Sequence, residues 1–240
     1  MEAVFSSDSV NTDVLPSSIS YGLDPSGNFV TGKRDATVYA LGNTYSPNGV
    51  KMITIPFGSS HEWLDPASVI FSANLIKPEA AALQAASPDP NVLFERVDIR
   101  CGGVLVESLS DWGRCNELFT RLTMNPTKKL NLAQLGFGTE IPATSAVPYW
   151  DAAQNHTATP LTGAAGTSKR IFWRLNLSAL FSQHRWIPLY ALSGRGIECN
   201  FFLAPFSESL VAGSGNTMKY ELQDCQAKCS MLTLDDSLQD

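Results

Sequence analysis

The chain of 240 residues is long enough for one large all-β domain, and its 44% hydrophobic and 10% aromatic content is sufficient for a packed core. Only 17% of its residues are charged, against roughly 25% in an average soluble domain, and the net charge of −6 argues against a broad nucleic-acid-binding face. No apolar run approaches the roughly 20 residues that cross a bilayer, and the first residues lack the basic start and apolar stretch of a signal peptide.

The first part of the chain differs from the rest in composition. Residues 1–50 are rich in Ser, Asn, Asp, Gly and Pro and show little periodicity, which predicts an N-terminal arm. From residue 51 onward, apolar and polar residues alternate as they do along half-buried strands. Gly102 and Gly103 separate two of these segments, and such a pair is a strong hairpin signal.

One helix and one long loop interrupt the strands. Asp111 is a favourable N-cap for a helix over residues 111–122. The apolar residues at helical spacing are Trp112, Cys115, Leu118, Phe119 and Leu122. We expect this apolar face to be packed, with Cys115 as a buried thiol. Asn125 and Pro126 end the helix, and residues 125–168 form a long loop that we expect to be functional or packed on a neighbour.

The pattern predicts an all-β fold without the βαβ rhythm of a parallel sheet. The predicted strands cover 51–57, 67–76, 92–101, 104–109, 170–177, 186–192, 196–204 and 219–234. Eight antiparallel strands with one apolar face each are typical of a jelly-roll sandwich of two four-stranded sheets. We therefore expect a jelly-roll domain over 51–240, with the helix 111–122 and the loop 125–168 inserted in it.

The five cysteines do not suggest a disulfide framework. They are Cys101, Cys115, Cys199, Cys225 and Cys229. Their number is odd, their spacing is scattered, and no secretory signal precedes them, so we expect free thiols. Cys225 and Cys229 would lie roughly 13 Å apart on one strand, which is too far for a disulfide.

The sequence offers no convincing active site. The three histidines, His61, His156 and His184, are far apart, and the predicted inward positions are apolar. A metal site on a jelly roll would need several converging His and carboxylate ligands. There is no Gly-rich phosphate loop and no nucleophile elbow. We therefore expect a protein that is not an enzyme, with no catalytic residue, no cofactor-binding residue and no metal ligand.

Two carboxylate pairs remain as candidates for binding a cation. Glu62 lies close to Asp65, and Asp235 is followed by Asp236. Both pairs occur in turn-like segments, where solvated acids are ordinary. For Asp65 and the Pro66 that follows, the simpler interpretation is a turn in which the carboxylate accepts backbone N–H bonds.

The segment 167–192 concentrates basic and aromatic residues. Arg170, Arg174 and Arg185 could form an anion site, but positions at outer faces and corners are the stronger interpretation. Trp173 and Trp186 are more simply explained as packing groups than as a sugar platform. If Trp173 is a buried core residue, its replacement by Ala should cost roughly 3–5 kcal/mol of stability.

Four segments resemble the major capsid proteins of double jelly-roll viruses, most closely those of the polinton-like and adintovirus-like groups. They are HEWLDPASVIFSANL (61–75), LFERVDIRCGGVLVESLSDWGRCNELF (93–119), RWIPLYALSGRGIECNFFL (185–203) and YELQDCQAKCSMLTLDDSL (220–238). The likeness covers roughly residues 51–238, and its motifs are short and mostly structural. That family carries two jelly rolls in tandem, whereas 240 residues hold only one. The chain would correspond to the first jelly roll, as an N-terminal portion, a cleaved product or a single-roll relative.

The resemblance also implies a function. It implies a structural subunit that associates with copies of itself into trimeric capsomers, and with other capsid proteins into an icosahedral shell. The location implied is the virion, after assembly in the cytoplasm or nucleus of a host cell. It implies no membrane span and no sequence-specific contact with nucleic acid.

A lectin-like carbohydrate-binding sandwich is the alternative from another class of protein. It would use exposed aromatic side chains as stacking surfaces for sugars. The candidates are Trp63, Trp112, Tyr149 and Trp150, the last two within VPYWDAAQN (147–155). Saturable sugar binding by the monomer would favour this alternative.

Overall fold

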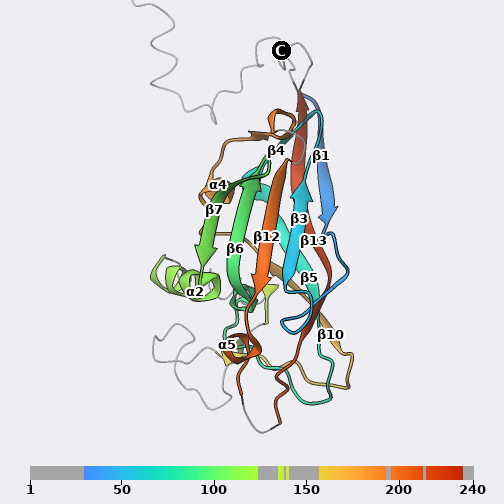
Figure 1. Cartoon of the computed structure of the whole chain (residues 1–240), viewed down its shortest axis with the longest axis vertical. Helices are drawn as coiled ribbons and strands as arrows, with labels where there is room; N and C mark the ends of the chain where they lie inside the picture. Colours follow the sequence, from blue (N-terminus) through green and yellow to red (C-terminus); the bar gives the residue numbers. More distant parts are fainter. Residues whose placement is uncertain are drawn as a thin grey trace, which may run out of the picture.

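Two antiparallel β-sheets stack face to face in the computed structural model (Figure 1). The structure describes residues 30–123, 135–137, 139–140, 157–192, 196–212 and 215–234. The sheet at the front of Figure 1 has four strands in the order β3, β12, β6 and β7. Their bounds are Met52–Phe57, Ile197–Leu203, Phe94–Cys101 and Val104–Ser110.

The second sheet is built around the long strand β13 (Glu221–Leu234). One side of β13 pairs with β1 and β2, which span Val30–Tyr39 and Thr44–Tyr45. Its other side pairs with β5 and β4, which span Ile70–Ile76 and Glu62–Leu64. Beyond these two lie β10 and β11, which span Ser168–Trp173 and Ile187–Pro188. This sheet is therefore larger than the expected four strands.

Among the described residues, the remaining elements with stated bounds are short, apart from one helix. The helix α2 covers Trp112–Thr123. The other helical elements are η1 (Pro66–Ser68), η2 (Pro90–Leu93), α4 (Ala179–Ser182), η3 (Leu189–Ala191) and α5 (Phe206–Ser209). The strands β8 (Thr139–Glu140) and β9 (Thr157–Ala158) form a separate pair.

The order of the eight long strands confirms an eight-stranded antiparallel jelly roll. Counted along the chain, these strands are β1, β3, β5, β6, β7, β10, β12 and β13. We number these eight strands 1 to 8 in chain order. From one edge to the other, the strands of one sheet are then 1, 8, 3 and 6, and those of the other sheet are 2, 7, 4 and 5. Each sheet therefore interleaves early and late strands, as a chain does when it wraps into two Greek keys.

The identity of two predicted strands is corrected. The first strand of the roll is β1, which lies inside the segment expected to be an irregular arm. Only Ala36 of β1 is buried, because β1 is an edge strand that is held by its backbone ladder to β13. Its sequence therefore shows almost no apolar alternation. The predicted strand 186–192 reduces to β11 followed by a 3-10 turn, because Pro188 has no N–H to donate to a ladder. Residues 1–29 lie outside the described part.

The other predicted strands are confirmed, and all of them except β7 have an apolar face turned inward. In β3, for example, Ile53, Ile55 and Phe57 are fully buried. The hairpin between β6 and β7 also has the expected form. Gly102 and Gly103 have φ of 58° and 86°, the left-handed values that a type I′ turn requires at both positions.

Aromatic rings fill the space between the sheets. Trp173 is 3% exposed and stacks on Phe71 at 6.0 Å between ring centroids. It also meets Phe94 at 5.0 Å and Phe201 at 5.8 Å. These rings come from β10, β5, β6 and β12, so they join both sheets. The interpretation of Trp173 as a packing residue is confirmed.

The turn before β12 depends on a glycine. Gly196 has a φ of 62°, and a Cβ at this position would overlap the carbonyl oxygen of Phe57. Only glycine combines the left-handed conformation with such a close approach of two backbones. All five cysteines are free thiols, as expected.

Candidate assembly surface

The helix α2 has the predicted length, but its buried face agrees only in part with the predicted one, in which Trp112 is buried and Phe119 is partly buried. The residues turned toward the sandwich are Trp112, Asn116 and Thr120, which follow one another at four-residue spacing. The predicted apolar face is largely exposed, with Leu118 60% and Leu122 76% accessible. Cys115 is exposed as well, so the expectation of a packed thiol there is wrong.

Polar contacts attach α2 to the short helix η2. Trp112 donates its indole N–H to Asn91 Oδ1 at 2.9 Å, and Asn116 donates to Asp89 Oδ2 at 2.6 Å. The other oxygen of Asp89 accepts from the backbone and side-chain nitrogens of Asn91 at 2.9 and 2.8 Å. Hydrogen bonds are directional, so this network fixes the orientation of the helix as well as its position.

Asp89 is the ionisable centre of this network. Burial raises the pKa of its carboxyl group, although the three hydrogen bonds it accepts act in the opposite direction. The Oδ1 atom of Asn116 is buried without a partner among the described residues. Substitution at Asp89 should therefore disturb the attachment of α2, because a buried network that loses one member leaves others unsatisfied.

The exposed face of α2 continues along an edge of the front sheet. The strand β7 is the last strand of that sheet and leads directly into α2 (Figure 1). Three successive residues of β7, Val104, Leu105 and Val106, are exposed. We call these three residues, together with Leu118 and Leu122, the α2 edge. Val104–Val106 begin β7, and α2 follows the other end of that strand, so the exposed apolar side chains form two separate groups along this edge. Exposed apolar surface of this kind is available to a partner.

The predicted cation-binding pairs have structural roles where the structure describes them. Glu62 forms an ion pair with Arg34 of β1, and the pKa of Glu62 is lowered by that contact. Asp65 accepts a hydrogen bond from Ala67 N at the start of η1, as the turn interpretation predicts. No cluster of three metal-ligating side chains occurs among the described residues. Asp235 and Asp236 lie outside them, as does His156.

The three arginines of the segment 167–192 have separate environments. Arg170 donates to Asn74 Oδ1 at 3.1 Å and to Ser72 Oγ at 2.8 Å on the neighbouring strand β5. Arg174 and Arg185 are exposed, one just after β10 and one just before β11. These positions agree with the preferred interpretation of outer faces and corners.

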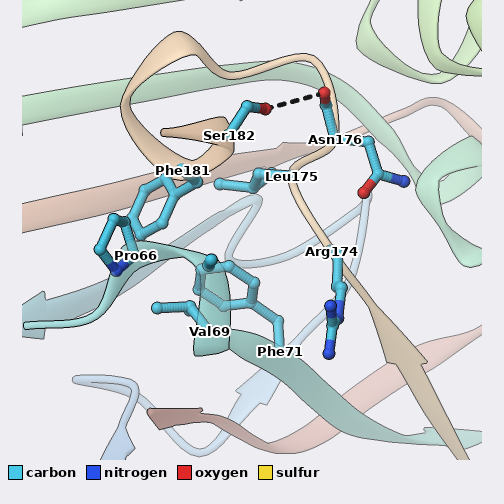
Figure 2. Close-up of a pocket in the computed structure, with 9 residues that line it drawn as sticks. Pro66, Val69, Phe71, Arg174, Leu175, Asn176, Phe181 and Ser182 are labelled. Atoms are coloured by element: carbon cyan, nitrogen blue, oxygen red, sulfur yellow. Dashed lines mark hydrogen bonds between the residues drawn. The ribbon is translucent and has the colours of Figure 1, made fainter. Parts of the chain in front are cut away.

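The pocket in Figure 2 lies between η1 and the turn that follows β10. It has a volume of about 190 Å³. Its apolar lining includes Val69, Phe71 and Phe181, and Arg174 lies at one side. The hydrogen bond from Ser182 Oγ to the carbonyl oxygen of Asn176, 3.1 Å long, closes the turn above it (Figure 2). The pocket is small and has no convergent set of polar groups such as ligand sites use.

Neither of the two described aromatic candidates of the lectin-like alternative is a fully exposed platform. Trp112 is fully buried. Trp63 is partly buried and contacts Tyr190 edge to face at 5.8 Å. Tyr149 and Trp150 lie outside the described residues.

Several solved viral structures share this fold. The chain matches the VP54 protein of the virus PBCV-1 with a TM-score of 0.52 and 10% identity, over 89% of this chain and 45% of that one. It matches a chain of the quasi-atomic PBCV-1 capsid with a TM-score of 0.54 and 11% identity, over 89% and 45% of the two chains. A chain of the Sputnik virophage gives 0.54 and 9%, over 93% and 52%.

In fold, the chain is similar to one half of a double jelly-roll major capsid protein. The chain spans about half the length of these matched chains. No protein-family model and no curated protein matches its sequence. The expected resemblance is thus confirmed for the fold, and the narrower likeness to the polinton-like and adintovirus-like groups stays a prediction. No helix within the described residues has the length and apolarity needed to cross a bilayer.

Proposed function

We propose that this protein is a structural subunit of a viral capsid. The observation that carries the proposal is the wrapped order of its eight long strands, which aligns over 89–93% of the chain with proteins of the PBCV-1 capsid and the Sputnik virophage. The exposed apolar residues of the α2 edge support it, because a subunit of a shell must keep such surface for its neighbours.

The proposal includes the mode of assembly. The jelly roll would associate with further jelly rolls into trimeric capsomers, and these would build an icosahedral shell with other capsid proteins. The protein would then be found in the virion. Catalysis has no part in this function, and the contacts of Glu62, Asp65 and Arg170 serve the fold.

The mass of the purified chain in solution tests the proposal. Light scattering after size exclusion, with electron microscopy of the same fractions, should find trimers, sheets or shells as the concentration rises. A monomer at every concentration would contradict it. Sugar titration of that monomer would then test the lectin-like alternative, which requires saturable binding without association.

A further inference from the structure

The pocket in Figure 2 has the size of one small apolar group. Its volume is about 190 Å³, and an apolar protein cavity of about 150 Å³ holds a benzene molecule. Six of its nine lining residues are apolar, and the rings of Phe71 and Phe181 meet edge to face at 6.1 Å between centroids. The pocket can therefore take one six-membered ring, whereas drug-sized ligands fill sites of about 300–1,000 Å³.

One wall of the pocket is η1, which is tied to β13. Asp65 Oδ1 accepts from Ala67 N at 3.1 Å, and Ser68 Oγ donates to Asp65 O at 2.7 Å. Ser230 N of β13 in turn donates to Ser68 Oγ at 2.8 Å. These bonds fix η1 on the sheet, so this wall does not depend on a ligand for its position.

A second wall is α4, which is tied to the other sheet. Glu107 of β7 accepts from Ser178 Oγ at 2.7 Å and from Leu180 N at 2.8 Å. Ser178 Oγ accepts from Phe181 N at 3.2 Å, and the Phe181 ring lines the pocket. Both walls are thus held by the fold itself, and binding does not have to bear the entropic cost of ordering them.

A single charged side chain lines the pocket. Arg174 is exposed just after β10 and lies at one side of the pocket (Figure 2). Among the described residues, its guanidinium takes part in no ion pair and no hydrogen bond. The carboxylates of Asp65 and Glu107 do not line the pocket and accept hydrogen bonds within the walls. The charge that the lining presents to a ligand is therefore positive.

The sparse polar groups of the lining limit the class of ligand. Ser182 Oγ is already used in its bond to Asn176 O. A sugar or a nucleotide would bury several polar groups without partners, and each such group costs free energy. An apolar body with one anionic group avoids this cost, because a guanidinium binds a carboxylate through two parallel hydrogen bonds.

We propose that this pocket binds a small carboxylate whose apolar body is a single six-membered ring. Arg174 pairs with the carboxylate, and the ring lies among Val69, Phe71 and Phe181. The inference goes beyond the proposed capsid function, since the pocket lies within one chain. A ligand that binds only the folded chain also raises the stability of the subunit.

Phenylacetate is the probe, and two related compounds separate the parts of the site. Phenylacetamide keeps the ring and removes the charge, whereas acetate keeps the charge and removes the ring. Each compound is titrated into the isotope-labelled chain, and changes in its amide NMR spectrum give the dissociation constant. The titrations use low salt, because Arg174 is exposed and salt screens exposed charges.

Two kinds of variant test the named residues. Arg174→Gln removes the charge from the pocket, and Arg185→Gln, at an exposed arginine outside the lining, is its matched control. Val69→Phe fills the pocket, and circular dichroism shows whether this variant folds. If it does not fold, Ala67→Phe replaces it, because Ala67 is exposed and also lines the pocket.

The expected results follow from the two parts of the site. Phenylacetate should saturate the wild type at one molecule per chain, and acetate should show no saturation over the same range. Phenylacetamide should bind about tenfold more weakly, because it lacks the charge-assisted hydrogen bonds to Arg174. Arg174→Gln should weaken the binding of phenylacetate by about the same factor and leave that of phenylacetamide unchanged. Arg185→Gln should alter neither affinity, and the pocket-filling variant should bind neither ring compound.

Several outcomes would overturn the inference. They are a wild type that phenylacetate does not saturate, and equal affinities for phenylacetate and phenylacetamide. Equal losses in the Arg174 and Arg185 variants would show a general effect of charge instead of a contact in the pocket. Unchanged binding to a folded pocket-filling variant would place the ligand elsewhere. Assembly into a shell is tested separately by light scattering, so the failure of either proposal leaves the other standing.

Discussion

Replacement of Trp173 tests the physical basis of the sandwich most directly. The indole lies between the sheets against Phe71, Phe94 and Phe201, and it is almost fully buried. Trp173→Ala removes the ring and leaves a cavity that rings on both sheets cannot fill without moving. Substitutions of this kind cost about 3–5 kcal/mol of the free energy of unfolding.

Trp173→Phe is the informative companion. The indole N–H of Trp173 is buried without a hydrogen-bond partner among the described residues. Phenylalanine keeps an aromatic ring in the cluster and removes that unsatisfied donor, whose burial costs about 1–3 kcal/mol. The effects of the lost apolar contact and of the removed donor on the free energy of unfolding should largely cancel. We expect Trp173→Phe to lie within about 1 kcal/mol of the wild type.

Urea unfolding followed by far-ultraviolet circular dichroism measures both variants without relying on tryptophan fluorescence. Thermal unfolding should show a decrease in Tm on the order of 10 °C for Trp173→Ala, since about 1 kcal/mol corresponds to roughly 2–4 °C in a domain of this size. A loss below about 1 kcal/mol for Trp173→Ala would refute the reasoning. It would mean that the two sheets do not depend on this aromatic cluster.

Three further predictions concern single positions. Gly196→Ala should destabilise the protein by about 3 kcal/mol or more, because it combines left-handed strain with a backbone overlap. Gly166→Ala is strained but lies in open space, so it should cost about 1–2 kcal/mol. Equal losses of unfolding free energy in urea would show that the overlap has no effect. The exposed Cys115 should be the first thiol to react with a thiol reagent. Burial raises the pKa of Cys225 to about 12, so Cys225 should react only on unfolding. Cys115→Ser should remove the fast phase of the thiol reaction. Because burial raises the pKa of Asp89 in the folded state, its contribution to stability is fully present below the ordinary carboxyl pKa of about 3.9 and is lost as pH rises through the raised value. The stability of Asp89→Asn should lack this dependence on pH. Parallel plots of stability against pH for the variant and the wild type would contradict the prediction.

The strands that bury one face could be predicted from the sequence, and those held by backbone pairing alone could not. In β3, β5 and β12 every second residue is apolar and buried, so period and burial coincide. In β1 only Ala36 is buried, and the ladder to β13 is made by backbone groups that every residue possesses. An edge strand of this kind has no signature in its side chains. At Pro188 the side chains predict more strand than forms. The apolar run 186–192 predicts a full strand, but only the two residues of β11 pair, because Pro188 has no N–H to donate.

The helix α2 shows how a correct pattern can lead to a wrong surface. Its leucines recur at helical spacing, and such spacing predicts a face that is covered. Yet the covered side of the helix within this chain is the one with Trp112 and Asn116, whose hydrogen bonds to Asn91 and Asp89 can form in a single orientation. Apolar periodicity predicts that one face of a helix is buried, but it does not identify what that face packs against. The polar network determines the orientation of the helix. Turning Leu118 inward would remove the donors of Asn91 Oδ1 and Asp89 Oδ2, and a leucine offers no hydrogen bond in their place. The exposed leucines are thus a consequence of the way α2 is attached.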